Sequence, residues 1–126
     1  MDMDQLDAHA KVIVDCAYQI HRRIGPGLLE SAYKAILAAD LHRKGMKVQR
    51  EKPVSLEYDG IVIPNAFKAD LFVEGQILVE VKSVGTIVEI HEKQTLTYLR
   101  LLKCPLAFLI NFGGVLIRDE IKRYRN

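Results

Sequence analysis

The sequence predicts a mixed α+β domain in which helices flank a central mixed β-sheet. Three observations lead to this expectation. Two stretches near the start, residues 4–24 and 28–44, repeat apolar side chains every three or four positions, which is typical of amphipathic helices. Strand-like alternation follows over residues 46–82, and a helical stretch at 88–103 precedes a continuous apolar run at 106–110. The predicted order is therefore helix, helix, three strands, helix and strand (α-α-β-β-β-α-β).

The composition is that of an ordinary globular protein. The chain has 126 residues, 49% of them hydrophobic and 27% charged, so a single domain spanning residues 1–126 is expected. A net charge of +2 permits binding to a polyanion without requiring it. Cys16 and Cys104 have no metal-binding spacing and are expected to be buried thiols in a reducing compartment. No apolar run approaches the roughly 20 residues that span a bilayer, and the polar start does not resemble a signal peptide. We therefore expect a cytoplasmic protein without membrane contact.

The second helix has a distinctive entry. Gly25-Pro26-Gly27 breaks the first helix, and Gly45 ends the second. Glu30 falls in the first turn, where the helix dipole favours an acid, and Tyr33 follows, where an aromatic at the edge of the core is the simplest interpretation. The rigid entry also fixes the direction in which Glu30 points. The expected buried stripe of this helix consists of Leu29, Ala32, Ile36 and Ala39.

Turn signals divide the strand region into three strands. Asp59-Gly60 is typical of a type I′ hairpin turn, and Glu74-Gly75-Gln76 closes a second hairpin. Pro64 and Asn65 interrupt the middle strand, so an edge position or a bulge is expected there. Near the end of the chain, Val115-Leu116-Ile117 is expected to form a short last strand that a basic tail follows.

The second hairpin brings together side chains that could bind a metal ion or take part in catalysis. If residues 74–76 form the loop, Asp70 lies directly opposite Glu80, with Cβ atoms roughly 4.5–5.5 Å apart. Lys82 shares the face of Glu80. Two like charges so placed need neutralisation, by Lys82 or by a hard divalent cation that prefers oxygen ligands. A solvated outer face is the alternative for any single acid here, and a one-residue change of register would weaken the cluster.

The third helix carries His91, Gln94 and Tyr98 on one face, at positions i, i+3 and i+7. A helix that follows the strand at residues 77–82 begins near the carboxyl end of that strand, so its first turns could overlook the carboxylates. The alternative is a solvated face for His91 and Gln94 and the rim of the core for Tyr98. A separate group of basic residues could contact phosphates or could form an ordinary solvated surface, and the sequence favours neither. The group consists of Arg43, Lys44, Lys47, Arg50 and Lys52.

Taken together, these residues resemble a known family. The stretch from Gly27 to Tyr33 fits G-x-x-E-x-x-Y. With Asp70, the run Glu80-Val81-Lys82 and the element Gln94-x-x-x-Tyr98, the chain resembles the GxxExxY protein family of the PD-(D/E)XK nuclease-like superfamily. The similarity covers nearly the whole chain, with one departure at Ala69, where the superfamily has a proline. The resemblance implies a restriction-endonuclease-like core in a single PD-(D/E)XK nuclease-like domain.

The resemblance also implies a role for each residue. Asp70 and Glu80 would bind Mg²⁺ or Mn²⁺, with the backbone carbonyl of Val81 as a further ligand. Glu30 would add a carboxylate to the metal site, directly or through water. Lys82 would orient the attacking water and stabilise charge on the phosphate, as a base or as a cation. The expected catalytic residues are therefore Glu30, Asp70, Glu80 and Lys82, and the expected substrate contacts are Tyr33, His91, Gln94 and Tyr98.

The expected function is a Mg²⁺-dependent deoxyribonuclease, a hydrolase of phosphodiester bonds with DNA preferred over RNA as its substrate. The alternative is a non-catalytic module that keeps the nuclease fold and binds nucleic acid or a protein partner. The expected partner of the enzyme is nucleic acid. A homodimer is also allowed, because small nucleases often pair to cut two strands.

Overall fold

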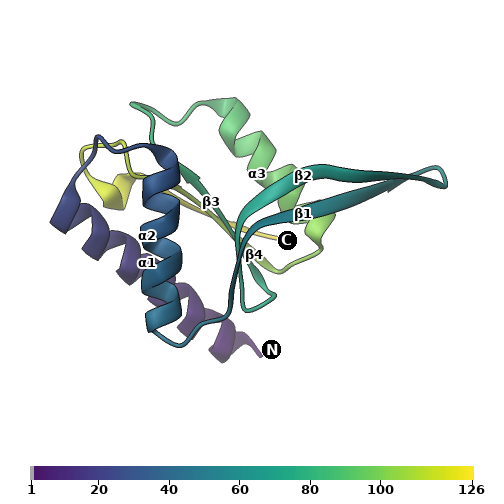
Figure 1. Ribbon diagram of the computed structural model, residues 1–126. Coiled ribbons are helices and arrows are strands. Elements are labelled where there is room, and N and C mark those ends of the chain that lie inside the picture. The colour runs from purple at the N-terminus through teal and green to yellow at the C-terminus, as the bar shows by residue number, and fades with distance from the viewer. Residues whose placement is uncertain (1) are drawn as a thin grey trace.

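The computed structural model describes residues 2–126 (Figure 1). A short 3-10 helix at Ile117–Asp119 precedes the last strand. The helices and strands follow in the order α1 (Met3–Ile24), α2 (Glu30–Arg43), β1 (Val48–Tyr58), β2 (Ile61–Val73), β3 (Ile77–Lys82), α3 (Glu89–Leu102), β4 (Leu106–Asn111) and β5 (Ile121–Arg125). The mixed α+β class predicted from the sequence is confirmed.

The strands form one mixed sheet in the order β1-β2-β3-β4-β5. Strands β3 and β4 are parallel, and the other neighbouring strands are antiparallel. Helix α3 connects β3 to β4, because a parallel pair needs a crossover that returns the chain to the same end of the sheet. Every residue of β4 is buried, so the apolar run at 106–110 forms an interior strand that is covered on both faces, as the sequence predicted.

Helices cover both faces of the sheet. Helices α1 and α2 lie on one side, and α3 lies on the other (Figure 1). Successive side chains of a strand point to opposite faces of the sheet, so each face has its own apolar cluster. Leu71 and Val79 pack with α1 and α2, while Phe72 and Leu78 pack with Leu99 of α3. In the described part of the chain, no helix has both the length and the apolar character that a membrane crossing requires.

Helix α2 buries a different face from the one that the sequence predicted. Its buried residues are Tyr33, Leu37, Ala38 and Leu41. The predicted stripe was wrong at Leu29, which is the N-cap and is 77% exposed, and at Ala39, which is exposed, whereas Ile36 is half-buried and packs against the core. Apolar residues are spread around most of this helix, so its periodicity does not select a face, and packing against the sheet decides.

Strands β1 and β2 form a long ribbon that projects beyond the rest of the molecule (Figure 1). Asp59 and Gly60 have φ angles of 49° and 80°, which confirms the type I′ turn at its tip. The predicted irregularity is a bulge, since the register shifts between Val54 and Leu56 of β1 and Asn65 has a φ of 53°.

The end of the chain differs from the prediction. Val115 and Leu116 are exposed and lie outside any strand, whereas Ile121–Arg125, expected to be a tail, forms β5 and pairs with β4. The segment is rich in Lys and Arg, and such charges are typical of an edge strand, where they discourage pairing with another chain. The positive charge that led to the prediction of an unpaired tail is therefore compatible with an edge strand.

Candidate active site

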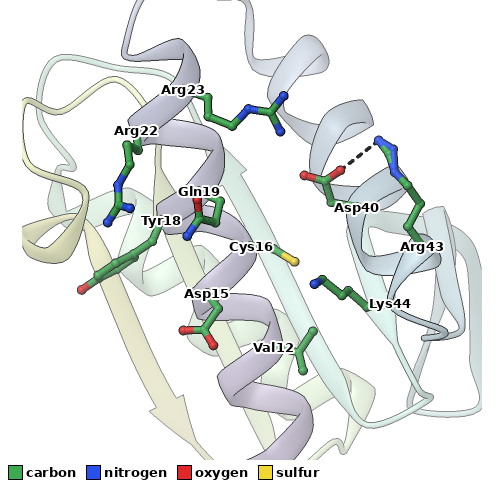
Figure 2. Close-up of a pocket in the computed structure, with 10 residues that line it drawn as sticks. All are labelled: Val12, Asp15, Cys16, Tyr18, Gln19, Arg22, Arg23, Asp40, Arg43 and Lys44. Atoms are coloured by element: carbon green, nitrogen blue, oxygen red, sulfur yellow. Dashed lines mark ion pairs between the residues drawn. The ribbon is translucent and has the colours of Figure 1, made fainter.

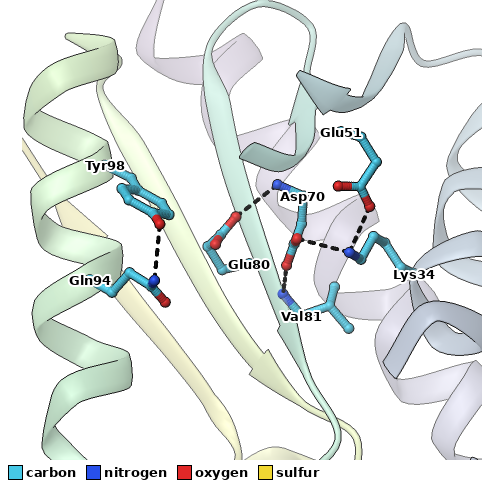
Figure 3. Close-up of polar contacts among 7 residues, drawn as sticks. All are labelled: Lys34, Glu51, Asp70, Glu80, Val81, Gln94 and Tyr98. Carbon is cyan, nitrogen blue, oxygen red and sulfur yellow. Dashed lines mark hydrogen bonds and ion pairs between the residues drawn. The ribbon is translucent and has the colours of Figure 1, made fainter. Parts of the chain in front are cut away.

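Asp70 on β2 and Glu80 on β3 lie where the pairing of their strands ends. The last paired residues are Leu71 and Val79, so Asp70 and Glu80 are next in line, as the sequence predicted. Their carboxylates take over the hydrogen bonds of the ladder. Glu80 Oε2 accepts from the backbone N–H of Asp70 at 2.9 Å, and Asp70 Oδ2 accepts from the N–H of Val81 at 2.8 Å (Figure 3). Each acid is thus fixed to the strand of the other.

Both acids are withdrawn from solvent. Asp70 is 9% exposed and Glu80 is 4% exposed. Burial, followed by the negative charge of Asp70, raises the pKa of Glu80 to about 8, against the opposing effect of the Asp70 N–H and the ammonium groups of Lys82 and Lys34. Burial therefore favours the protonated form of the Glu80 carboxyl. Full ionisation of the pair needs additional positive charge beside it.

Lys34 of α2 supplies part of that charge, although sequence analysis did not single it out. Its ammonium lies 2.9 Å from Asp70 Oδ1 and 2.7 Å from Glu51 Oε1 of β1 (Figure 3). Burial alone would lower the pKa of Lys34, but its hydrogen bonds to Glu51 and Asp70 outweigh burial and raise that pKa to about 12. Lys34 is therefore a permanent cation at the edge of the carboxylate pair.

Glu30, expected at the site, lies one helical turn before Lys34 and is half-buried. Lys34, and not Glu30, extends from α2 to Asp70. Lys82 is also half-buried and shares the face of Glu80 by strand alternation. Among residues 2–126, neither Glu30 nor Lys82 has an ion pair. Their direct roles in chemistry remain predictions.

Helix α3 faces the pair from the other side. Gln94 and Tyr98 project from α3 toward Glu80, and the amide of Gln94 donates to the Tyr98 hydroxyl at 2.9 Å (Figure 3). Burial and the charge of Glu80 raise the pKa of Tyr98. The ring of Tyr98 stacks on Phe67 with centroids 3.9 Å apart. His91 instead accepts from the Val88 N–H through Nδ1 at 3.2 Å and caps the start of α3.

Tyr33 does not line the site, contrary to the expectation that it contacts substrate. It is 0% exposed, and its ring stacks on Phe112 at 4.7 Å. Its hydroxyl donates to the carbonyl of Gly25 at 2.5 Å and accepts from the Leu28 N–H at 3.2 Å. Tyr33 therefore holds the bend before α2 in place, and its influence on the site is indirect.

Asn111 organises the loops at the carboxyl ends of β3 and β4. It is fully buried. Its Oδ1 accepts from the N–H groups of Val84 and Gly113, and its Nδ2 donates to the Val84 carbonyl and to Glu120, each at 3.0 Å. These bonds fix the loop that follows Lys82. Asn111 belongs to none of the motifs in the sequence, and no role was predicted for it.

A separate cavity of about 840 Å³ lies between α1 and α2 (Figure 2). Asp70, Glu80 and Lys82 do not line it. Arg43 at its rim pairs with Asp40 at 2.9 Å. Burial, followed by the charge of Asp40, raises the pKa of the Cys16 thiol beside it, which keeps the sulfur protonated and unreactive. The cavity is therefore distinct from the carboxylate site.

The donor set at the carboxylate pair suits a magnesium-like cation. No three His, Cys, Asp or Glu side chains gather to hold a metal within the described chain, so the convergence of Glu30 with Asp70 and Glu80 is not seen. Mg²⁺, however, commonly takes only one or two carboxylates and completes its shell with water and substrate phosphate. Asp70 and Glu80 meet that requirement, and the raised pKa of Glu80 reflects their need for a cation.

Comparison with known proteins places this arrangement in a family. The family model described as the PD-(D/E)XK nuclease superfamily matches residues 7–124. The chain belongs to this superfamily. No curated protein sequence matches it. A solved structure, described as the crystal structure of SSO0001, shares 20% identity and a TM-score of 0.44, over 90% of this chain and 64% of that one. At that level the similarity adds nothing to the family assignment.

Membership in the PD-(D/E)XK superfamily gives the observed residues a context. The five-strand mixed sheet flanked by helices is consistent with a restriction-endonuclease-like fold. Asp70 and the Glu80-Val81-Lys82 run fit the signature after which the superfamily is named. The superfamily implies nuclease chemistry, a nucleic-acid substrate and, typically, a divalent metal.

Lys34 and Glu51 stand outside the PD-(D/E)XK signature. A signal for Lys34 was present in the sequence, because it follows Glu30 by four residues and so shares its helix face. No comparable spacing or motif in the sequence points to Glu51. It has a φ of 51° in the middle of a strand, a conformation that non-glycine residues rarely adopt, and nothing in the local sequence marks it.

Proposed function

We propose that this chain is a divalent-metal-dependent nuclease of the GxxExxY group that hydrolyses phosphodiester bonds, with DNA as its substrate. The observation that carries the proposal is the buried pair of Asp70 and Glu80, bonded crosswise between neighbouring strands in a PD-(D/E)XK chain. The GxxExxY assignment rests on the stretch from Gly27 to Tyr33.

Each side chain has a distinct task in this proposal. Asp70 and Glu80 hold Mg²⁺ or Mn²⁺ together with the Val81 carbonyl, and Glu30 contributes through water. The cation supplies charge relief at the phosphate and makes an attacking water more acidic. Lys82, on the same face as Glu80, orients that water and stabilises the phosphate.

The groups on α3 serve the substrate in the same proposal. Gln94 and Tyr98 donate to the nucleic-acid backbone on the side of Glu80 that faces α3. His91 fixes the start of α3 through Nδ1 and so the position of both residues, and its other ring nitrogen contacts the substrate. Tyr33 supports the bend that leads into Glu30.

A non-catalytic nucleic-acid-binding module is the second candidate, and one observation favours it. Lys34 already pairs with Asp70, so the site has a cation of its own without a metal. The two candidates differ in whether covalent bonds in the nucleic acid are broken.

The deciding experiment is cleavage of labelled single-stranded, duplex and branched DNA and RNA with Mg²⁺, Mn²⁺ or EDTA. The proposal expects metal-dependent cleavage that Asp70→Asn, Glu80→Gln and Lys82→Met each reduce by roughly 100-fold or more. Asp119→Asn is the matched control, because its carboxylate is 66% exposed on the 3-10 helix. Activity that is equal in wild type and Lys82→Met would come from a contaminant, and binding without cleavage would favour the module.

Pairing of two copies belongs to the same proposal. Four apolar side chains are exposed at the tip of the β1–β2 ribbon, namely Tyr58, Ile61, Val62 and Ile63. Clustered exposed apolar groups often mark an interaction surface. Light scattering on a sizing column should give the mass of a dimer for wild type and of a monomer for Val62→Lys; a monomeric wild type would refute the pairing.

A further inference from the structure

Three acidic residues lie in one row across neighbouring strands. Arg50 pairs with Leu71 and Lys52 pairs with Ala69, so Glu51 of β1, between these two pairs, lies level with Asp70 of β2. Glu80 of β3 is next to Asp70 on its other side, where it is bonded to the Asp70 N–H. Asp70 is therefore the middle member of a row of carboxylates.

The ammonium of Lys34 sits between two members of this row. It contacts Asp70 Oδ1 at 2.9 Å and Glu51 Oε1 at 2.7 Å (Figure 3). The side chains of Lys34 and Asp70 are only 11% and 12% exposed, so this ion pair is screened little by water. The other oxygen of Asp70, Oδ2, already accepts from the Val81 N–H. Lys34 thus holds the one Asp70 oxygen that the backbone leaves open.

We propose that Lys34 is a tethered cation that competes with a divalent metal for Asp70, and that Glu51 is the partner that retains Lys34 when the metal binds. The inference rests on the proposed function, because it concerns the metal affinity of that site. A cation that approaches Asp70 meets an ammonium of like charge at the oxygen it needs. Glu51, whose side chain is 47% exposed, gives the ammonium a second carboxylate within reach. The pair Lys34–Glu51 then sets how tightly the site binds metal.

This arrangement predicts effects of opposite sign from the two members of one ion pair. Lys34→Met removes the competing charge, so metal affinity rises by roughly tenfold. Glu51→Gln removes the alternative partner and leaves Lys34 to Asp70 alone, so metal affinity falls several-fold. Lys34→Arg keeps the charge and stays close to wild type. A purely structural role for the Lys34–Glu51 pair would give losses for both removals, because each breaks the same contact.

The test is calorimetric titration of metal-free protein with Mn²⁺ and with Ca²⁺, without nucleic acid, so that binding is read independently of activity. Lys93→Met is the matched control, since Lys93 pairs with Glu89 on the exposed face of α3 at 3.0 Å. Circular dichroism melting reports folding for every variant. If Lys34→Met does not fold, Glu51→Gln still tests the inference through its predicted loss of affinity.

The outcomes separate this inference from the proposed function. Tighter binding by Lys34→Met with weaker binding by Glu51→Gln supports it, as does metal binding by Lys34→Met where wild type binds none. Metal binding by wild type that neither substitution changes, or that both weaken alike, overturns the inference and leaves the metal site intact. Absence of metal binding in wild type and all variants overturns both.

Discussion

The carboxylate of Glu80 accepts a hydrogen bond from the backbone N–H of Asp70 at 2.9 Å, while Asp70 accepts from the N–H beside Glu80, that of Val81, at 2.8 Å. Because each side chain replaces a ladder acceptor of the opposite strand, neither can rotate away without leaving a backbone donor unpaired. The two acids are therefore held close together before any cation arrives. Such preorganisation concentrates negative charge at one point of the sheet and raises the proton affinity of Glu80.

The proton on Glu80 should make stability depend on pH. Its pKa lies at about 8 in the folded protein against an ordinary value of 4.5, so the folded state binds a proton that the unfolded state has lost between these values. The contribution of Glu80 to the free energy of unfolding of metal-free protein should therefore be fully present below pH 4.5 and be lost, on the order of a few kcal/mol, as pH rises through 8. Urea unfolding in EDTA across this range measures it.

Glu80→Gln is the control for this pH dependence, because glutamine keeps an oxygen for the Asp70 N–H but has no proton to lose. Its stability should vary less between pH 4.5 and 8 than that of wild type. Equal slopes for the two proteins would mean that another group carries the effect.

The hydroxyl of Tyr98 should matter for nucleic acid and not for folding. Tyr98→Phe keeps the stack on Phe67 and loses only the bond from Gln94 and the group facing Glu80. Its melting temperature should stay near that of wild type, while nucleic-acid affinity falls by about tenfold. Fluorescence anisotropy with labelled DNA measures this. Tyr98→Ala should also lose about 2 kcal/mol of stability, because it removes the aromatic contact.

Tyr33 should show the reverse pattern. Tyr33→Phe leaves the ring on Phe112 but removes the hydroxyl that joins Gly25 to the Leu28 N–H. Unfolding free energy should fall by about 1–2 kcal/mol, with DNA affinity unchanged at a temperature where both proteins are folded. A loss of affinity without a loss of stability would instead restore Tyr33 as a substrate contact.

The parts of the site that the sequence predicted are those joined by short-range rules. Asp70 and Glu80 are ten positions apart. The two-residue period of a strand and the length of the turn between them were enough to predict that they lie opposite each other. The Asp59-Gly60 turn and the buried strand β4 were predicted on similarly local grounds.

The parts that the sequence did not predict depend on packing. Lys34 reaches Asp70 across 36 positions of the chain, and only the docking of α2 on the sheet brings them together. The buried face of α2 and the pairing of β5 are decided in the same way, since α2 is apolar on several sides and β5 carries the charges of an edge. The helix face that Lys34 shares with Glu30 was visible in the sequence, but which residue of the sheet that face meets was not.

Asn111 should prove the most sensitive of the uncharged residues near the site. Asn111→Ala leaves the N–H of Val84 and the carboxylate of Glu120 without their partner inside the protein, so unfolding free energy should fall by on the order of 3 kcal/mol. The loop after Lys82 should loosen as well, because the Asn111 side chain bonds both the N–H and the carbonyl of Val84. Hydrogen exchange of residues 83–86 should therefore quicken. Gln49→Ala, at an exposed position of β1, is the control and should change neither quantity; an Asn111→Ala protein as stable as wild type would show that water replaces the amide at no cost.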